Sequence, residues 1–159
     1  MPVKYGLGFV FALVITAAGV TLWLPSQSGT DGQQQAGGPS IEITDAYLNL
    51  PPPGQSTTAA YIKISNRDQL AVSIIAFETS KAARVELHEH LHVDGMMKMR
   101  KIEALLLVGL QTTLFQPMGY HLMVFDLASD VVLGDMVNFT MTLASGERIP
   151  FQAQARSLQ

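Results

Sequence analysis

Histidine and methionine, two residue types that bind soft metal ions through uncharged donor atoms, gather in one part of this sequence. All four histidines and five of the eight methionines lie between residues 88 and 123. The chain contains no cysteine, so a thioether is the only sulfur donor it offers. The residues concerned are His88, His90, His92, His121, Met96, Met97, Met99, Met118 and Met123. Their clustering indicates a site for a soft ion.

Three of the histidines belong to residues 82–92, a segment that reads as a β-strand. Because strand side chains alternate, Val85, Leu87 and Leu91 face one side, and Glu86 faces the other together with the three histidines. We therefore expect these imidazoles to face away from the core. A plain solvated strand face is the alternative interpretation. It leaves open whether His90 and His92 contact a metal.

The remaining donors lie on two later segments. Met97 and Met99 share one face of the next expected strand. Further along, His121 and Met123 point the same way in an extended strand, about 7 Å apart at Cα, so their tips can converge on one ion. Methionine more often fills a core, which is the alternative for any one of these residues. Taken together, two imidazoles and two thioethers favour copper(I) over zinc, calcium or magnesium.

The segments that must position these donors read as short strands separated by turn signals such as Pro51-Pro52-Pro53-Gly54 and Pro117-Met118-Gly119. No sustained helical period occurs after residue 40. Close spacing of the strands predicts an all-β domain, an antiparallel Greek-key barrel or sandwich. The expected strands are residues 41–49, 58–66, 70–77, 82–92, 96–103, 112–116, 119–127, 136–144 and 147–155.

The N-terminal part differs in character from this domain. Residues 6–24 are nearly all apolar behind Lys4, which is typical of an export segment, either a cleaved signal peptide or a membrane anchor formed by residues 5–24. Residues 25–40 are rich in Gly, Gln, Ser and Pro and read as a flexible linker. Both interpretations of residues 1–24 place the domain over 41–155 outside the cytoplasm.

Several function classes are disfavoured by composition and motif. The charge balance of 10 Lys and Arg against 13 Asp and Glu provides no basic stripe for nucleic acid. The chain lacks an HExxH motif, a phosphate-binding Gly-rich loop and a Ser-His-Asp order at a plausible turn, so no enzyme is predicted. A blue-copper electron carrier would need a cysteine thiolate.

The spacing of four donors is distinctive: His88, ten residues, Met99, twenty-one residues, His121, one residue, Met123. It resembles the signature of the PCu(A)C family of periplasmic copper(I) chaperones. The residues around these donors are similar too. They are Val-Glu-Leu-His-Glu at residues 85–89 and Gly-Tyr-His-Leu-Met at residues 119–123. The likeness extends over residues 41–155.

This resemblance implies a cupredoxin-like β-barrel that holds copper(I) on His88, Met99, His121 and Met123. It also implies a periplasmic role in cytochrome c oxidase assembly. The expected acceptors are the CuA centre on cytochrome c oxidase subunit II and a thioredoxin-like copper or thiol protein. A copper storage or resistance protein with the same site, and a metal-free β-sandwich interaction module, remain alternatives.

The sequence departs from the family pattern at three places. Met118-Gly119 stands where the family commonly has two glycines, which either adds a sulfur near the site or fills space. Residues 105–109, Leu-Leu-Leu-Val-Gly, stand in place of a Gly-rich turn. The chain ends in Gln-Ala-Arg-Ser-Leu-Gln, without the His- and Met-rich tail of some relatives, so no tail site is expected.

Overall fold

The structure, a computed structural model, describes Met1 and residues 40–93 and 95–158. The predicted export segment and most of the linker lie outside the described residues, so they stay predictions. In the described part the secondary structure is all β, and no helix there is long and apolar enough to cross a membrane. The strands are β1 (Ile41–Asn49), β2 (Thr58–Asn66), β3 (Val72–Glu78), β4 (Ala82–Val93), β5 (Met96–Lys101), β6 (Leu105–Leu107), β7 (Thr112–Leu114), β8 (Tyr120–Leu127), β9 (Met136–Leu143) and β10 (Arg148–Arg156).

Nine of these strands match the expected ones to within a few residues, which confirms the all-β prediction. The strand that the sequence did not reveal is β6. Its buried Leu105 and Leu107 flank an exposed Leu106, so both faces carry leucine and the polar alternation that marks a strand is missing. Residues expected to form an altered turn therefore continue the sheet by pairing with β3.

Seven strands close into a barrel, in the order β4-β8-β2-β1-β10-β9-β3 and back to β4. The closing contact between β3 and β4 is a single paired position, Phe77 opposite Val85. Strands β1 and β10 pair in parallel, and the other neighbours in the ring are antiparallel. Of the two architectures that the strand pattern allowed, the chain forms the barrel.

The barrel interior is filled by the apolar side chains that alternate along its strands. In β2, every second residue from Thr58 to Asn66 is buried. The largest fully buried apolar side chains are Phe139, Leu48, Ile62, Ile64, Ile74, Leu107, Leu122, Met141, Leu143 and Val124. Each such side chain contributes about 1.5–3 kcal/mol by leaving water, and together they fix which face of each strand points outward.

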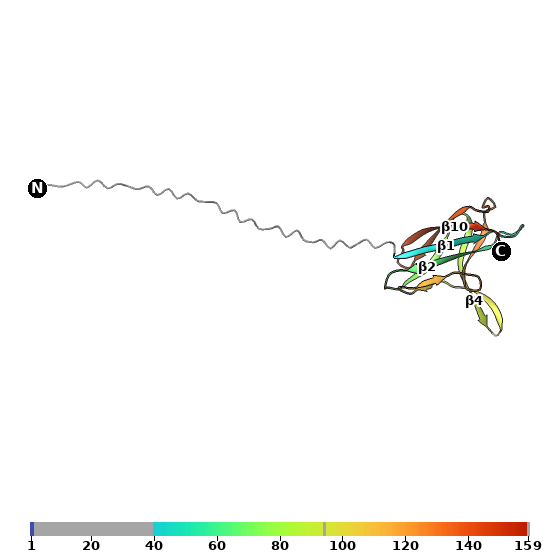
Figure 1. Ribbon diagram of the computed structural model, residues 1–159, viewed down its shortest axis with the longest axis horizontal. Coiled ribbons are helices and arrows are strands. Elements are labelled where there is room, and N and C mark those ends of the chain that lie inside the picture. The colour runs from blue at the N-terminus through green and yellow to red at the C-terminus, as the bar shows by residue number, and fades with distance from the viewer. Residues whose placement is uncertain (2–39, 94, 159) are drawn as a thin grey trace. The chain divides into compact units, whose positions relative to one another are not determined.

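One strand is longer than the barrel requires. The twelve residues of β4 pair with β8 from Ala82 to Glu89, and the last six pair with β5. All six residues of β5 are exposed. The β4–β5 hairpin therefore projects from the barrel, as Figure 1 shows in yellow-green beside the label β4. We call residues 90–93 and 95–99 of this hairpin the arm.

The loop before β7 approaches the loop after β2 closely at Gly109. A Cβ built on Gly109 would lie 2.1 Å from the carbonyl oxygen of Gln69, and the N–H of Leu110 donates to Asp68 O at 2.8 Å. We expect Gly109→Ala to lower the free energy of unfolding by about 1–3 kcal/mol, because the backbone must shift. Chemical denaturation measures this. Gly119→Ala is the control, since a Cβ there meets only ordinary contacts at 3.5 Å; an equal loss in both variants would contradict the packing argument.

Candidate metal centre

Two of the predicted ligands face each other across the β4–β8 ladder. His88 lies directly opposite His121, with ring centroids 5.8 Å apart. The next pair along the ladder, Leu87 opposite Leu122, is buried in the core. Because side chains alternate, burial of the leucine pair directs both imidazoles to the outer face of the barrel. The structure thus confirms the predicted faces of these strands.

Each of the two imidazoles is anchored through one ring nitrogen. His88 Nε2 lies 2.9 Å from Glu86 Oε2, and His121 Nδ1 lies 3.0 Å from the carbonyl oxygen of Gly119. A carboxylate and a carbonyl only accept hydrogen bonds, so in both rings the anchored nitrogen is the N–H donor. In a neutral ring the other nitrogen then carries a free lone pair.

These remaining nitrogens are buried and have no hydrogen-bond partner. The atoms are His88 Nδ1 and His121 Nε2, and His90 Nδ1 shares the condition. His121 is only 2% exposed although it points away from the core. A buried acceptor without a partner costs roughly 1–3 kcal/mol, which a bound ion would recover. A solvated strand face, the alternative interpretation, therefore describes the exposed His92 but not the other three histidines.

His90 belongs to this cluster more closely than the sequence indicated. Its ring stacks on that of His121 with centroids 4.7 Å apart, and its backbone N–H donates to Gly119 O at 3.3 Å. Sequence reasoning left His90 undecided and gave no role to Glu86 or Gly119. The signal was present, because all three lie two residues from a predicted ligand, on the same strand face or in the turn leading to it.

The two predicted thioether ligands lie on either side of the histidine pair. We call two directly opposed residues a rung. On the face that carries His88, the neighbouring rung on one side is Glu86 opposite Met123, and the neighbouring rung on the other side is His90 opposite Met99. Rungs on one face are roughly 7 Å apart, within reach of flexible side chains. Met123 is partly buried, whereas Met99 is 50% exposed on the arm.

The charges around the pair centre on Glu86. Arg84 lies 3.0 Å from this carboxylate and Lys101 3.8 Å. The hydrogen bond from His88 is the main reason why the pKa of Glu86 lies below its usual range, and both cations act in the same direction. Within the described residues, no three His, Asp or Glu side chains are grouped to hold a metal ion by themselves. The other soft donors on this face are the thioethers of Met99 and Met123, which hard ions avoid.

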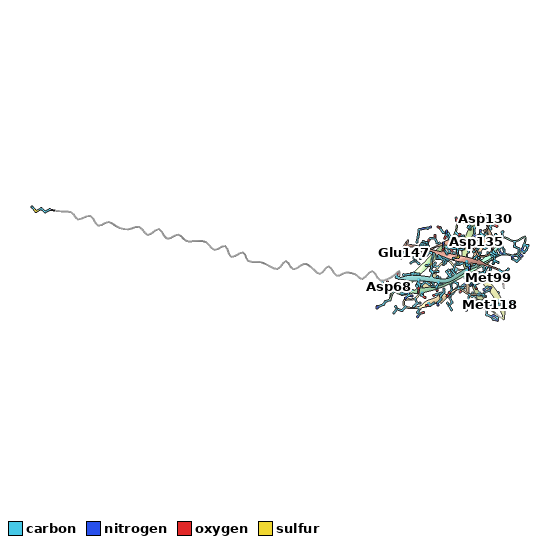
Figure 2. The ribbon with its side chains drawn as sticks, turned by 45° about the horizontal axis from the view of Figure 1, so that its top comes forward. Asp68, Met99, Met118, Asp130, Asp135 and Glu147 are labelled. Atoms are coloured by element: carbon cyan, nitrogen blue, oxygen red, sulfur yellow. The ribbon has the colours of Figure 1, made fainter. Side chains whose placement is uncertain are left out.

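The turn into β8 contains a strained methionine. Met118 has a φ of 66°, a left-handed conformation that glycine adopts without strain. This is the position where the resembling family commonly has glycine. The side chain is 65% exposed, so it does not fill space in the core. In Figure 2 Met118 and Met99 lie toward the same end of the domain, away from Asp68.

Comparisons with known proteins agree with this architecture. The family model LpqE-like, described as "Putative lipoprotein LpqE-like", matches residues 41–155. The "Putative lipoprotein Lxx21020" of Leifsonia xyli subsp. xyli (strain CTCB07) is 23% identical over 142 residues, which cover 89% of this chain and 82% of that protein.

Among solved structures, the copper-bound PCuAC domain from PmoF2 matches with a TM-score of 0.63 at 17% identity. The match covers 76% of this chain and 95% of the PmoF2 domain. The copper(I) form of DR1885 from Deinococcus radiodurans has a TM-score of 0.62 at 25% identity, over 78% of this chain and 85% of its own. These likenesses confirm the predicted fold.

Burial of His121 gives the metal-free domain a pH dependence. Burial is the main cause that lowers the pKa of this imidazole below 6.5, and His90 and His88 add to the effect. The unfolded chain takes up a proton near pH 6.5 that the folded chain resists, so stability is full above this pH and falls as the pH drops below it. We expect the free energy of unfolding of the metal-free domain to decrease more between pH 7.5 and 5 than that of His121→Gln, measured by denaturation at each pH. Parallel profiles would contradict this.

Proposed function

The chain belongs to the LpqE-like family, and we propose that it is a copper(I) carrier that binds one ion outside the cytoplasm through His88, Met99, His121 and Met123. The observation that carries this proposal is the state of the two imidazoles. In each ring one N–H donates to an acceptor of the protein, and the other nitrogen is buried without a hydrogen-bond partner.

This arrangement is the one that metal-binding histidines have in general. A ligating imidazole usually donates its second ring N–H to a carboxylate or a backbone carbonyl, which fixes the ring's tautomer and orientation. Glu86 does this for His88, and Gly119 O does it for His121. An apolar core position or a solvated surface would not require both features at two opposed residues.

The thioethers decide which ion this pair would hold. Met99 and Met123 are the sulfur donors on the two rungs beside the histidine pair, and neither brings a charge. A neutral set of two imidazoles and two thioethers suits copper(I), whereas zinc sites combine imidazoles with thiolate, carboxylate or water rather than with thioethers. The solved relatives described as copper-bound and as a copper(I) form are consistent with this choice.

The exposure of the ligands suggests how the ion would leave. Met99 lies on the exposed arm, so an incoming thiolate from an acceptor can displace it first, while the buried His121 holds the ion until the last exchange. The ion stays copper(I) throughout, and no electron is transferred. The proposed acceptors are the CuA centre of cytochrome c oxidase subunit II and a thioredoxin-like copper or thiol protein.

The proposed location is the periplasm or the equivalent outer compartment. The matching family and the Leifsonia protein are described as lipoproteins. The 159 residues of this chain contain no cysteine to which a lipid could be joined by a thioether or thioester. Within these residues, the apolar segment over residues 5–24 is the proposed tether to the inner membrane, and its cleavage would leave the domain soluble in the same compartment.

The copper site is tested by anaerobic competition of copper(I) with a chromogenic chelator. We expect one tightly bound ion, and the double variant His121→Ala with Met123→Ala should lose it or weaken binding by more than about 100-fold, because loss of a supporting contact alone can cost that much. Met136→Ala, an exposed methionine on β9, is the control and should bind normally. No tight ion in the wild type, or equal binding in the double variant, would refute the site.

Delivery is distinguished from storage by a deletion strain. If the protein supplies copper to the oxidase, the deletion should lower cytochrome c oxidase activity, and added copper should restore it. The gene carrying the His121→Ala, Met123→Ala double variant should fail to complement, whereas the Met136→Ala gene should complement fully. Normal oxidase activity together with greater sensitivity to copper would instead identify a storage or resistance protein with the same site.

A further inference from the structure

The arm carries a second pair of soft donors that the proposed ligand set does not use. We propose that His92 and Met97 form a separate, outer site for a soft monovalent ion, copper(I) in the cell, at which an incoming ion is received before it reaches the histidine pair. Binding at this pair is argued from its own contacts, whereas its role as the point of entry rests on the proposed function.

The two side chains face each other across the hairpin. His92 and Met97 are a rung of the β4–β5 ladder, and His92 Nδ1 lies 2.9 Å from Met97 Sδ. A thioether is a weak hydrogen-bond acceptor, and both residues are exposed to water, which offers the imidazole better partners. The contact therefore gains little as a hydrogen bond, but it places one nitrogen and one sulfur donor side by side.

The two faces of the arm differ in chemistry. On the outer face of the barrel, the rung of His92 and Met97 is followed by that of His90 and Met99, and then by His88, which is opposed by His121 on β8. The other face of the hairpin carries Val93 opposite Met96 and an ion pair of Glu89 with Arg100. Imidazole–thioether rungs thus occur only on the face that leads to the histidine pair, within the described residues of the hairpin.

The donor types determine the ion. The rung has no carboxylate and no thiolate, so hard cations and zinc gain little there, whereas a soft monovalent ion gains a nitrogen and a sulfur donor without a charge being buried. Two donors leave coordination positions open. The outer site should consequently bind more weakly than the four-donor site, and it can pass its ion to the next rung, roughly 7 Å away.

Silver(I), a soft ion that does not change oxidation state in air, tests this site on the full 159-residue chain with 13C-methyl-labelled methionine. We expect the wild type to bind two equivalents, with the Met97 methyl signal moving as the second is added. His92→Ala with Met97→Ala should bind one equivalent. Val93→Ala with Met96→Ala, on the other face of the arm, is the matched control and should keep two. An unchanged Met141 methyl signal, from the core, reports that each variant is folded.

The outcomes separate this inference from the proposed function. His121→Ala with Met123→Ala should lose the tighter equivalent and keep the one that moves Met97. If that variant keeps both equivalents while the His92, Met97 variant loses one, the outer site stands and the proposed carrier site falls. A wild type that binds a single equivalent, or a second equivalent that survives the His92→Ala, Met97→Ala substitution, overturns the outer site.

Discussion

Burial of Leu87 against Leu122 in the β4–β8 ladder controls the geometry of the candidate site. Side chains alternate with a period of two, so a slip of one residue would send the leucines to solvent and His88 and His121 into the core. The register that buries the leucines therefore sets the imidazoles opposite each other on the outer face. Hydrophobic packing of the two leucines thus pre-assembles the histidine pair on the outer face.

That pre-assembly has an energetic consequence. Three ring nitrogens, on His88, His90 and His121, are shielded from water without a hydrogen-bond partner, and each lowers the stability of the metal-free fold by roughly 1–3 kcal/mol. An ion that binds there removes this penalty and needs no rearrangement of the two opposed strands. If the proposed ion binds there, part of its binding free energy is stored in the folded chain, as in other preorganised sites. The contacts with Glu86 and Gly119 O fix the orientation of the two rings, and with it the direction of their free lone pairs.

The sequence predicted local features well and long-range ones poorly. Turn residues and alternation located nine strands, and they placed His121 and Met123 on one face. They did not reveal β6, whose leucines face both ways, or whether the sheet closes into a barrel, which depends on the one pair, Phe77 and Val85, that joins β3 to β4 at the two ends of the strand order. The spacing of donors joined Met99 to the site but did not show that it opposes His90, because that depends on the pairing register of β4 with β5. Burial of His121 likewise depends on neighbouring strands.

The structure divides the donors into a fixed half and an exposed half, and this division suits an oxidising compartment. Thiolates exposed there would form disulfides, whereas thioethers do not, although they can be oxidised to sulfoxides and then lose their softness. Met97 and Met99 are exposed on the arm, so they are the donors most open to oxidation, while Met123 is partly buried and the imidazoles are not attacked in this way. If the chain carries copper(I) as proposed, oxidation would weaken the entry and exit of the ion before it disturbs the histidine pair. The same exposure would let an acceptor reach the arm, so susceptibility to oxidation and the proposed ion exchange would have one structural cause.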